Sequence, residues 1–291
     1  MDLSWILPPV QGCRKSKIFD LVGQPLRNPS QPNENARVSI TLPGRLLALD
    51  TCAVSDALDH LQITGATTGI RPMWGRPKIA GHARTVEAVD AAAGPAGRHL
   101  GTGTVANSGA GDVIVVANRG RPDVSCWGDI MTAAAQYRGI EGTVIDGACR
   151  DLDAVADAGF PVWARAAVPI TARGRLAERG SDVPILFAGV LVTPGDLVLA
   201  DGSGVVFLPA DRATEIIETA ERLAARQDAM RDAVRAGQPI TEVMHDDRFR
   251  AALSGDERLS PNEPVVARAV SSSRERAMPV RCAWSARRPG R

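Results

Sequence analysis

The residues best suited to chemistry lie in two short segments, CWGDIM (126–131) and DGACRD (146–151). Arg150 carries a planar guanidinium, which can hold a carboxylate or an enolate oxygen through two parallel hydrogen bonds. Asp129 and Asp151 add two carboxylates, the hard oxygen ligands that Mg²⁺ accepts while it keeps several waters. One arginine and two acids therefore suit a metal-assisted site for a 2-oxo acid.

Both segments stand where a predicted strand gives way to a predicted helix. The short apolar runs at 111–117 and 142–147 are typical of buried strands, and helical patterns follow at 128–139 and 150–159. Ligands of open α/β sheets bind at junctions of this kind. We therefore take the two segments together as one candidate ligand site.

The helix predicted after Gly128 would add backbone donors. The N–H groups of Ile130 and Met131 fall in its first turn, where free amides and the helix dipole favour a carboxylate. A structural role stays open, because an aspartate at a helix start is also a common cap and an adjacent arginine is often solvated. Cys149 has no evident base partner, so we expect a small buried residue there rather than a nucleophile.

The rest of the chain predicts further strands and helices. Their alternation in the middle of the chain, followed by a strand-rich segment, favours an α/β protein with a partly mixed sheet. An apolar helix face is expected up to residue 61, with Asp50 or Thr51 as its N-cap. The other expected elements are strands in FPVWA (160–164), PILFAGVLV (184–192), 197–200 and 204–208, and a long helix from Asp211 to about Ala236.

The amino-acid composition limits the classes of protein to which this chain can belong. The chain has 291 residues, a formal net charge of +1 and 44% apolar residues, which suits a globular protein with a substantial core. The near-neutral charge argues against nucleic acid as a partner, and no apolar run approaches the ~20 residues of a membrane helix. Five cysteines show neither CxxC nor zinc-type spacing, so we expect reduced thiols in a cytoplasmic protein.

The sequence pattern divides the chain into three parts. Residues 1–36 show no sustained period and are expected to form an N-terminal extension, and residues 256–291 are expected to form a C-terminal tail. Residues 37–255 are expected to form a single catalytic core domain. The sequence has no GxGxxG, GxxxxGK[ST], GxSxG or HExxH motif.

Four stretches resemble one known family. The segment 111–155, which contains WGDIM and DGACRD, is similar to the central signature of the RraA-like family, and 49–59, 69–88 and 192–209 resemble its flanking parts. The family includes the class II 4-hydroxy-4-methyl-2-oxoglutarate/4-carboxy-4-hydroxy-2-oxoadipate aldolases. The resemblance spans roughly 42–240. It implies an αββα sandwich with mixed sheets, assembled as a homotrimer or hexamer with sites between subunits.

The resemblance also implies an activity and individual roles. Arg150 would bind the pyruvate part of a small 2-oxo acid substrate and stabilise its enolate, and Asp151 would hold Mg²⁺ or Mn²⁺ directly or through water. Asp129 would stand beside the metal. The substrate carboxylate would lie on the turn formed by Gly128, Ile130 and Met131. The implied reaction is retro-aldol cleavage of a 4-hydroxy-2-oxo diacid to release pyruvate, with oxaloacetate decarboxylation as a second activity.

One position departs from the aldolase pattern. Those aldolases use a glutamate from the neighbouring subunit's C-terminal helix, and the aligned residue here is Gln227, whose amide cannot act as a base. Asp228 and Glu221 are the replacements that the sequence offers. Decarboxylation of a β-keto acid such as oxaloacetate needs no base at a hydroxyl group, so it would not depend on this glutamate.

Two other functions stay open at this point. One is a non-catalytic regulator that binds a ribonuclease, as some family members do. Those regulators typically lack the aspartate after the arginine, and its presence as Asp151 favours an enzyme. The other is an RraA-like enzyme of a specialised pathway, since the terminal extensions are absent from the compact family core.

Overall fold

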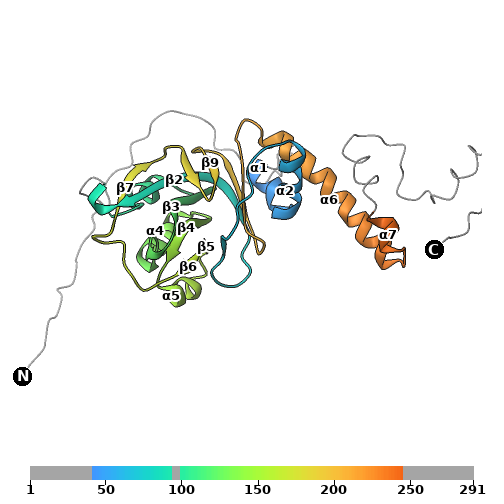
Figure 1. Cartoon of the computed structure of the whole chain (residues 1–291). Helices are drawn as coiled ribbons and strands as arrows, with labels where there is room; N and C mark the ends of the chain where they lie inside the picture. Colours follow the sequence, from blue (N-terminus) through green and yellow to red (C-terminus); the bar gives the residue numbers. More distant parts are fainter. Residues whose placement is uncertain (1–40, 94–98, 245–291) are drawn as a thin grey trace, which may run out of the picture. The chain divides into compact units, whose positions relative to one another are not determined.

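The computed structural model describes residues 41–93 and 99–244 (Figure 1). The predicted extension at 1–36, the tail at 256–291 and the core boundary at 255 lie outside these residues. In chain order the elements are α1 (Leu42–Leu47), α2 (Thr51–His60), β1 (Arg71–Pro72), β2 (Ile79–Asp90), a 3₁₀ turn (Ala91–Ala93), α3 (Thr102–Asn107), β3 (Asp112–Ser125), α4 (Asp129–Arg138), β4 (Gly142–Cys149), α5 (Leu152–Asp157), β5 (Val162–Ala164), β6 (Ala166–Ala167), β7 (Leu176–Ser181), β8 (Ile185–Phe187), β9 (Val190–Val192), β10 (Leu197–Ala200), β11 (Val205–Leu208), α6 (Ala213–Arg235) and α7 (Ile240–Val243).

Most strands belong to one mixed sheet with the order β1-β5-β4-β3-β2-β10-β11. Strands β2, β3, β4 and β5 run parallel, whereas β10 and β11 continue the sheet in antiparallel fashion beyond β2. The short strand β6 pairs with β4 and β7 pairs with β2, while β8 and β9 form a separate hairpin. Because β3 and β4 are parallel, their carboxyl ends lie at the same edge of the sheet.

The described residues form three apolar layers, two between strands and helices and one between strands. In the first, α4 and α5 cover one face of β3 and β4 through residues such as Met131 and Ile145. In the second, alternate residues of the same strands, such as Val144, face β10, β11 and the β8–β9 hairpin. In the third, α1, α2 and α6 cover the outer face of β10 and β11. The one large sheet therefore curves so that β10 and β11 face β3 and β4, with helices on both outer faces, which confirms the predicted α/β class and αββα arrangement. Figure 1 shows the helices α4 and α5 on one side of the strands and α1, α2 and α6 on the other.

Local sequence signals set the ends of α2 and α4. The Asp50 side chain accepts a hydrogen bond from the Ala53 amide at 2.7 Å, so Asp50 rather than Thr51 is the N-cap of α2. Helix α4 ends at Arg138 because Gly139 takes the left-handed conformation (φ 72°) that terminates helices at little cost. Both helices lie where the sequence predicts them.

Three strand regions go beyond the sequence prediction. The run 184–192 is a hairpin of two strands, because Ala188 and Gly189 both take positive φ (49° and 90°) in a two-residue turn. The long strand β2 is not predicted, because it serves different apolar layers along its length and its pattern is irregular. Strand β3 continues past residue 117 to Ser125, with register shifts against β4.

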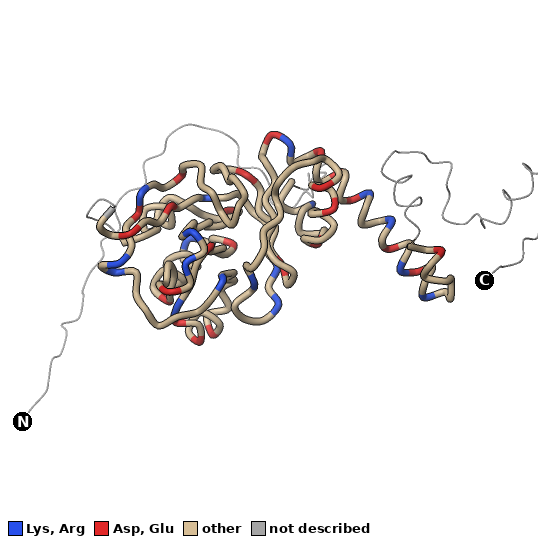
Figure 2. Tube along the Cα trace, viewed as in Figure 1, with Lys and Arg blue, Asp and Glu red and all other residues tan. Residues whose placement is uncertain are grey.

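Charged residues of both signs are interspersed along the described chain (Figure 2). Three arginines at the start and along the length of α6 pair with acids one turn away, in the pairs Arg212–Glu215, Arg231–Asp228 and Arg235–Asp232.

Within residues 41–93 and 99–244, no helix combines the length and apolar character needed to span a membrane.

Candidate active site

Two backbone hydrogen bonds bring the predicted site segments together beyond the carboxyl ends of β3 and β4. The Cys126 amide donates to the Ala148 carbonyl at 2.8 Å, and the Arg150 amide donates to the Trp127 carbonyl at 2.9 Å. Helix α4 begins at Asp129, within the first segment, and α5 begins at Leu152, directly after the second. The structure therefore places the predicted site residues in two adjoining segments, namely Gly128, Asp129, Ile130 and Met131 in one and Arg150 and Asp151 in the other.

Trp127 anchors the first of these segments in the core. Its side chain is buried and its ring stacks on Phe160, with ring centroids 6.0 Å apart. Its indole N–H donates to Thr132 Oγ1 at 2.9 Å. Thr132 lies in α4, and Phe160 lies between α5 and β5. Trp127 therefore fixes the position of the start of α4 relative to the segment that follows α5.

Arg150 and Asp151 form an ion pair that uses only one side of the guanidinium. The Arg150 Nε atom lies 3.0 Å from Asp151 Oδ2 and 3.2 Å from Oδ1. The terminal Nη groups make no hydrogen bond to the described part of the chain, so they can donate together to an oxyanion. About a third of each side chain is exposed (37% for Arg150 and 29% for Asp151), which leaves the pair accessible to a ligand.

The Asp151 backbone takes the left-handed conformation (φ 56°, ψ 38°), which is uncommon for a residue with a side chain but is tolerated by aspartate. Asp151 stands at the N-cap position of α5, yet its carboxylate accepts no hydrogen bond from that helix. Instead, Oδ2 lies 3.4 Å from the Asp129 amide at the start of α4. Asp151 therefore does not cap its own helix, and its carboxylate instead faces the first amide of α4.

Gly128 provides the space that the Arg150–Asp151 pair needs. A Cβ atom at this position would lie 2.6 Å from Asp151 Oδ2 and 3.1 Å from Arg150 Cγ. The first distance is shorter than a Cβ atom can approach another heavy atom. The φ angle of Gly128 is −160°, which any residue can adopt, so glycine is needed here for space rather than for backbone freedom.

We expect Gly128→Ala to lower the turnover of a 2-oxo acid substrate by about 100-fold, because displacing catalytic groups by about 1 Å has effects of that size. Pyruvate release measures turnover, and thermal unfolding checks that the fold is retained. Gly202→Ala is the matched control, since a Cβ atom there would meet nothing within 4 Å. Equal turnover in the two variants would contradict the importance of this close approach.

The first turn of α4 supplies backbone donors beside the ion pair. The Ile130 amide donates to Asp129 Oδ1 at 2.7 Å, whereas the Met131 amide has no partner within the described residues. Gly128, at the N-cap position, provides no side chain to cap the helix. An anion at this helix start would therefore meet the Met131 amide directly and compete with the Asp129 carboxylate for the Ile130 amide.

The two aspartates suit a hard divalent cation. Mg²⁺ is usually bound in proteins by one or two carboxylates together with waters and substrate oxygens, and Mn²⁺ prefers similar ligands. Within the described ranges, no group of three or more His, Cys, Asp or Glu side chains could hold a metal ion. The donor set of Asp129 and Asp151 is thus of the type that suits Mg²⁺ or Mn²⁺ completed by water or substrate oxygens, and the described residues do not form a closed Cys/His zinc site.

Cys149, next to Arg150, is a buried structural residue. It is 1% exposed, and its thiol lies 3.7 Å from the Ala166 carbonyl oxygen. Burial raises the pKa of the Cys149 thiol to about 11 and that of the buried Cys126 thiol to about 12. Since only the thiolate is a strong nucleophile, neither residue is activated at neutral pH.

Iodoacetamide at neutral pH should label Cys52 in the native protein and leave Cys126 and Cys149 unmodified, because Cys52 is exposed and the other two are buried with raised pKa values. Peptide mapping by mass spectrometry measures the labelling of each cysteine. Unfolded protein, in which all three should react, is the control. Labelling of native Cys149 as rapid as that of Cys52 would contradict its structural role.

The acids that could replace the aldolase glutamate are already paired within this chain. Glu221 accepts two hydrogen bonds from Arg45 of α1, at 2.9 and 2.7 Å, and this arginine lowers the pKa of Glu221. Asp228 pairs with Arg231 on α6. Neither acid makes a hydrogen bond or ion pair with Arg150 or Asp151 in this chain.

Gln227 has a carboxylate partner that sequence reasoning missed. Its side-chain amide donates to Asp56 Oδ2 at 2.9 Å, which joins α6 to α2. Partial burial raises the pKa of Asp56, and the Gln227 hydrogen bond opposes this shift. A carboxyl group with a raised pKa is better suited to proton transfer at neutral pH. Asp56 gives no signal in the sequence, because its partner is 171 positions away.

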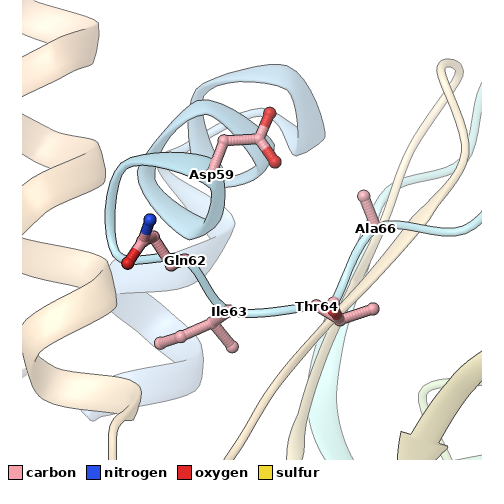
Figure 3. A pocket seen from close by; sticks show the side chains of 6 residues that line it. Asp59, Gln62, Ile63, Thr64 and Ala66 are labelled. Atoms are coloured by element: carbon pink, nitrogen blue, oxygen red, sulfur yellow. The ribbon is translucent and has the colours of Figure 1, made fainter.

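A depression at the end of α2 does not involve these residues (Figure 3). Its volume is about 350 Å³, and Figure 3 shows Asp59 and Gln62 above the extended chain that follows α2. It offers a single carboxylate and no arginine. Its lining residues are Asp59, Gln62, Ile63, Thr64, Gly65 and Ala66. The depression therefore lacks the paired groups that the site at Arg150 provides.

The fold and the site together define a member of the RraA-like family. Residues 51–207 match the family model described as RraA-like: Aldolase/RraA, which is more than half of the chain. The matched region contains both site segments and the strands that precede them. The chain therefore belongs to this family, as the sequence motifs indicate.

Individual relatives include proteins with different names. A Halalkalibacterium halodurans protein named "Putative 4-hydroxy-4-methyl-2-oxoglutarate aldolase" is 32% identical over 187 residues, which are 64% of this chain and 85% of that protein. Protein DlpA of Legionella pneumophila is 29% identical over 75% of this chain, but the match spans only 36% of the length of DlpA. The crystal structure of Streptomyces coelicolor RraAS2, described as an unusual member of the RNase ES inhibitor RraA protein family, has a TM-score of 0.59 at 29% identity and covers 65% of this chain and 95% of that one.

Proposed function

We propose that this protein is a divalent-metal-dependent lyase that cleaves a 4-hydroxy-2-oxo diacid by retro-aldol chemistry and releases pyruvate. The observation that carries the proposal is the Arg150–Asp151 pair, whose accessible groups stand beside the first turn of α4. The name of the Halalkalibacterium halodurans relative supports the reaction class.

Arg150 has the central role in this reaction. Its Nη groups donate hydrogen bonds to the substrate, and these bonds strengthen as negative charge builds up on the enolate oxygen while the C–C bond breaks. The Met131 and Ile130 amides hold the substrate carboxylate and so orient the reacting carbons. If Asp151 holds Mg²⁺ or Mn²⁺, directly or through water, with Asp129 beside it, the ion would supply Lewis-acid polarisation of the 2-oxo group.

Retro-aldol cleavage also needs an acceptor for the proton of the 4-hydroxyl group. Asp129 is one candidate in this chain, because it is exposed and its Oδ2 atom makes no hydrogen bond to the described residues. Asp56 of a neighbouring subunit is the alternative, since its pKa is raised whereas Glu221 and Asp228 are held by arginines. The second arrangement would transfer the role of the aldolase glutamate from α6 to α2.

The surface of α4 next to the site supports an assembly of several subunits. Ile130 is 80% exposed and Tyr137 is 90% exposed, and both lie on one helix face with the exposed Ala133 and Ala134. An apolar stripe of this kind is typical of a contact with another protein. We propose that a second copy covers it in a homotrimer or hexamer, which analytical ultracentrifugation would test.

A pyruvate-release assay tests the proposed reaction. It compares 4-hydroxy-4-methyl-2-oxoglutarate with oxaloacetate, each with and without added Mg²⁺ or Mn²⁺. Release from both substrates with either metal is the expected result. Release from oxaloacetate alone would show that the chain lacks the base for the 4-hydroxyl group. The absence of pyruvate from both would contradict the lyase.

A second candidate is a regulator that binds and inhibits a ribonuclease. The likeness to Streptomyces coelicolor RraAS2 favours it, since that protein belongs to a family of ribonuclease inhibitors. A regulator would inhibit the ribonuclease equally well after Asp151→Ala and would form no pyruvate. The lyase would lose its activity in the same variant, so one substitution separates the two functions.

A further inference from the structure

A second cavity, of about 520 Å³, lies beside the β8–β9 hairpin. Ala117 and Asp146, which line it, are paired residues from the middle of β3 and β4. The Ala117 side chain belongs to the apolar layer between the sheet and this hairpin, whereas α4 and α5 pack on the opposite face. None of Asp129, Arg150 and Asp151 lines this cavity. It is therefore separate from the candidate active site.

The cavity lining carries three arginines and two acids. The Arg165 Nε atom donates to Asp146 Oδ1 at 2.5 Å, and Arg179 forms an ion pair with Glu87. Arg119 has no hydrogen-bond or ion-pair partner among the described residues. Two of the three guanidinium charges are therefore neutralised, and the charge of Arg119 remains for a ligand.

Asp146 and Arg165 form a fixed wall of the cavity. The Asp146 side chain is 5% exposed, and its Oδ2 atom accepts a hydrogen bond from the Ala188 amide at 3.1 Å, which ties down the tip of the hairpin. A Cβ atom at Gly69 would lie 2.7 Å from Arg165 Nη1, and one at Gly120 would lie 3.4 Å from Arg165 Nε. The Arg165 side chain, 28% exposed, is thus held by its bond to Asp146 and passes close to Gly69 and Gly120.

The backbone at the cavity is strained in two places. Arg119 has a φ of 53° and Ala188 a φ of 49°, in the left-handed region that residues with a side chain rarely adopt. Both residues line the cavity, but the two-residue turn of the β8–β9 hairpin already accounts for the conformation of Ala188, which leaves that of Arg119. Asp151, in the candidate active site, has the same kind of backbone. A backbone in this region costs free energy, and such residues are often found at ligand-binding or catalytic sites.

We propose that this cavity binds a small organic anion, with a carboxylate or phosphate group on the Arg119 guanidinium. That group offers parallel N–H donors, which match the geometry of either oxyanion. The apolar part of the ligand would lie against Ala88, Ala117 and the 65%-exposed Leu186. The volume is in the range typical of small-molecule sites. This site does not depend on the proposed lyase activity, because it shares no residue with it.

Isothermal titration of the full chain with glutarate and, separately, with inorganic phosphate tests this site. The titrations use the Arg150→Ala variant as background, so that an anion bound by Arg150 does not contribute. Adding Arg119→Gln should weaken binding by about 10- to 100-fold, the effect of losing hydrogen bonds from one charged group. Adding Arg76→Gln is the matched control, since Arg76 is also an exposed arginine without a partner among the described residues but lies outside the cavity.

Arg119→Gly separates ligand binding from backbone strain. It removes the guanidinium and also relaxes the left-handed backbone, so binding should be lost while the melting temperature stays equal or rises.

Arg119-dependent binding of either probe supports the site, and the tighter probe identifies the preferred oxyanion. The proposal is overturned if neither probe binds, or if Arg119→Gln and Arg119→Gly bind as tightly as the background variant. Pyruvate release by Arg119→Gln in the otherwise wild-type chain should be unchanged.

Discussion

Replacing Arg150 by alanine should lower pyruvate release from 4-hydroxy-4-methyl-2-oxoglutarate by about 100- to 1,000-fold, the usual effect of removing a donor that stabilises a developing oxyanion. The lost donors are the Nη groups, which make no hydrogen bond within the described residues. The fold should survive, because the Arg150 backbone amide can still bond to the Trp127 carbonyl. Steady-state kinetics measures the change, and the loss should appear in kcat as well as in kcat/KM.

Two further variants make this result specific to Arg150. Arg150→Lys keeps the positive charge but loses the planar fork, so it should recover only part of the activity. Arg76→Ala removes another exposed arginine and should leave turnover unchanged. Near-normal turnover in Arg150→Ala would remove this residue from the reaction.

Replacing Asp151 by asparagine should abolish the stimulation of pyruvate release by Mg²⁺ or Mn²⁺ and lower turnover by about 100-fold or more, since metal polarisation contributes several kcal/mol. Asparagine has nearly the same shape as aspartate and tolerates the left-handed backbone found at this position (φ 56°). The loss would therefore reflect the missing charge rather than a distorted chain. Initial rates over a range of metal concentrations measure the effect.

Asp151→Gly controls for the backbone at the same position. Glycine adopts positive φ without strain, so this variant should unfold at the same or a higher temperature and should still be inactive. If Asp151→Gly retained the wild-type response to metal, the backbone conformation rather than the carboxylate would be the important feature of this residue.

The central part of the site can be predicted from the sequence because it depends on local signals. The apolar run before Arg150 indicates the second junction, and Gly139 marks the end of α4, whereas the continuation of β3 from residue 117 to Ser125 has no such local signal. Parallel pairing of β3 and β4 then places both junctions at one edge of the sheet. The nearness of the Arg150–Asp151 pair to α4 follows from this arrangement.

Other features depend on contacts between distant residues and gave no sequence signal. The Asp56–Gln227 pair joins α2 to α6, and the Asp146–Ala188 hydrogen bond joins β4 to the β8–β9 hairpin. The left-handed backbone of Arg119 could not be foreseen either, because arginine has no preference for that conformation. The second cavity is built from contacts of this kind.

Removal and return of the metal test the central claim most directly. The purified protein would be treated with EDTA, dialysed, and assayed for pyruvate release from 4-hydroxy-4-methyl-2-oxoglutarate before and after addition of Mg²⁺ or Mn²⁺, with Asp151→Asn treated in parallel. We expect no release without metal, recovery with either ion in the wild type, and no recovery in Asp151→Asn. Full release by the metal-free protein, or equal recovery in the variant, would contradict a metal-dependent lyase at Arg150 and Asp151.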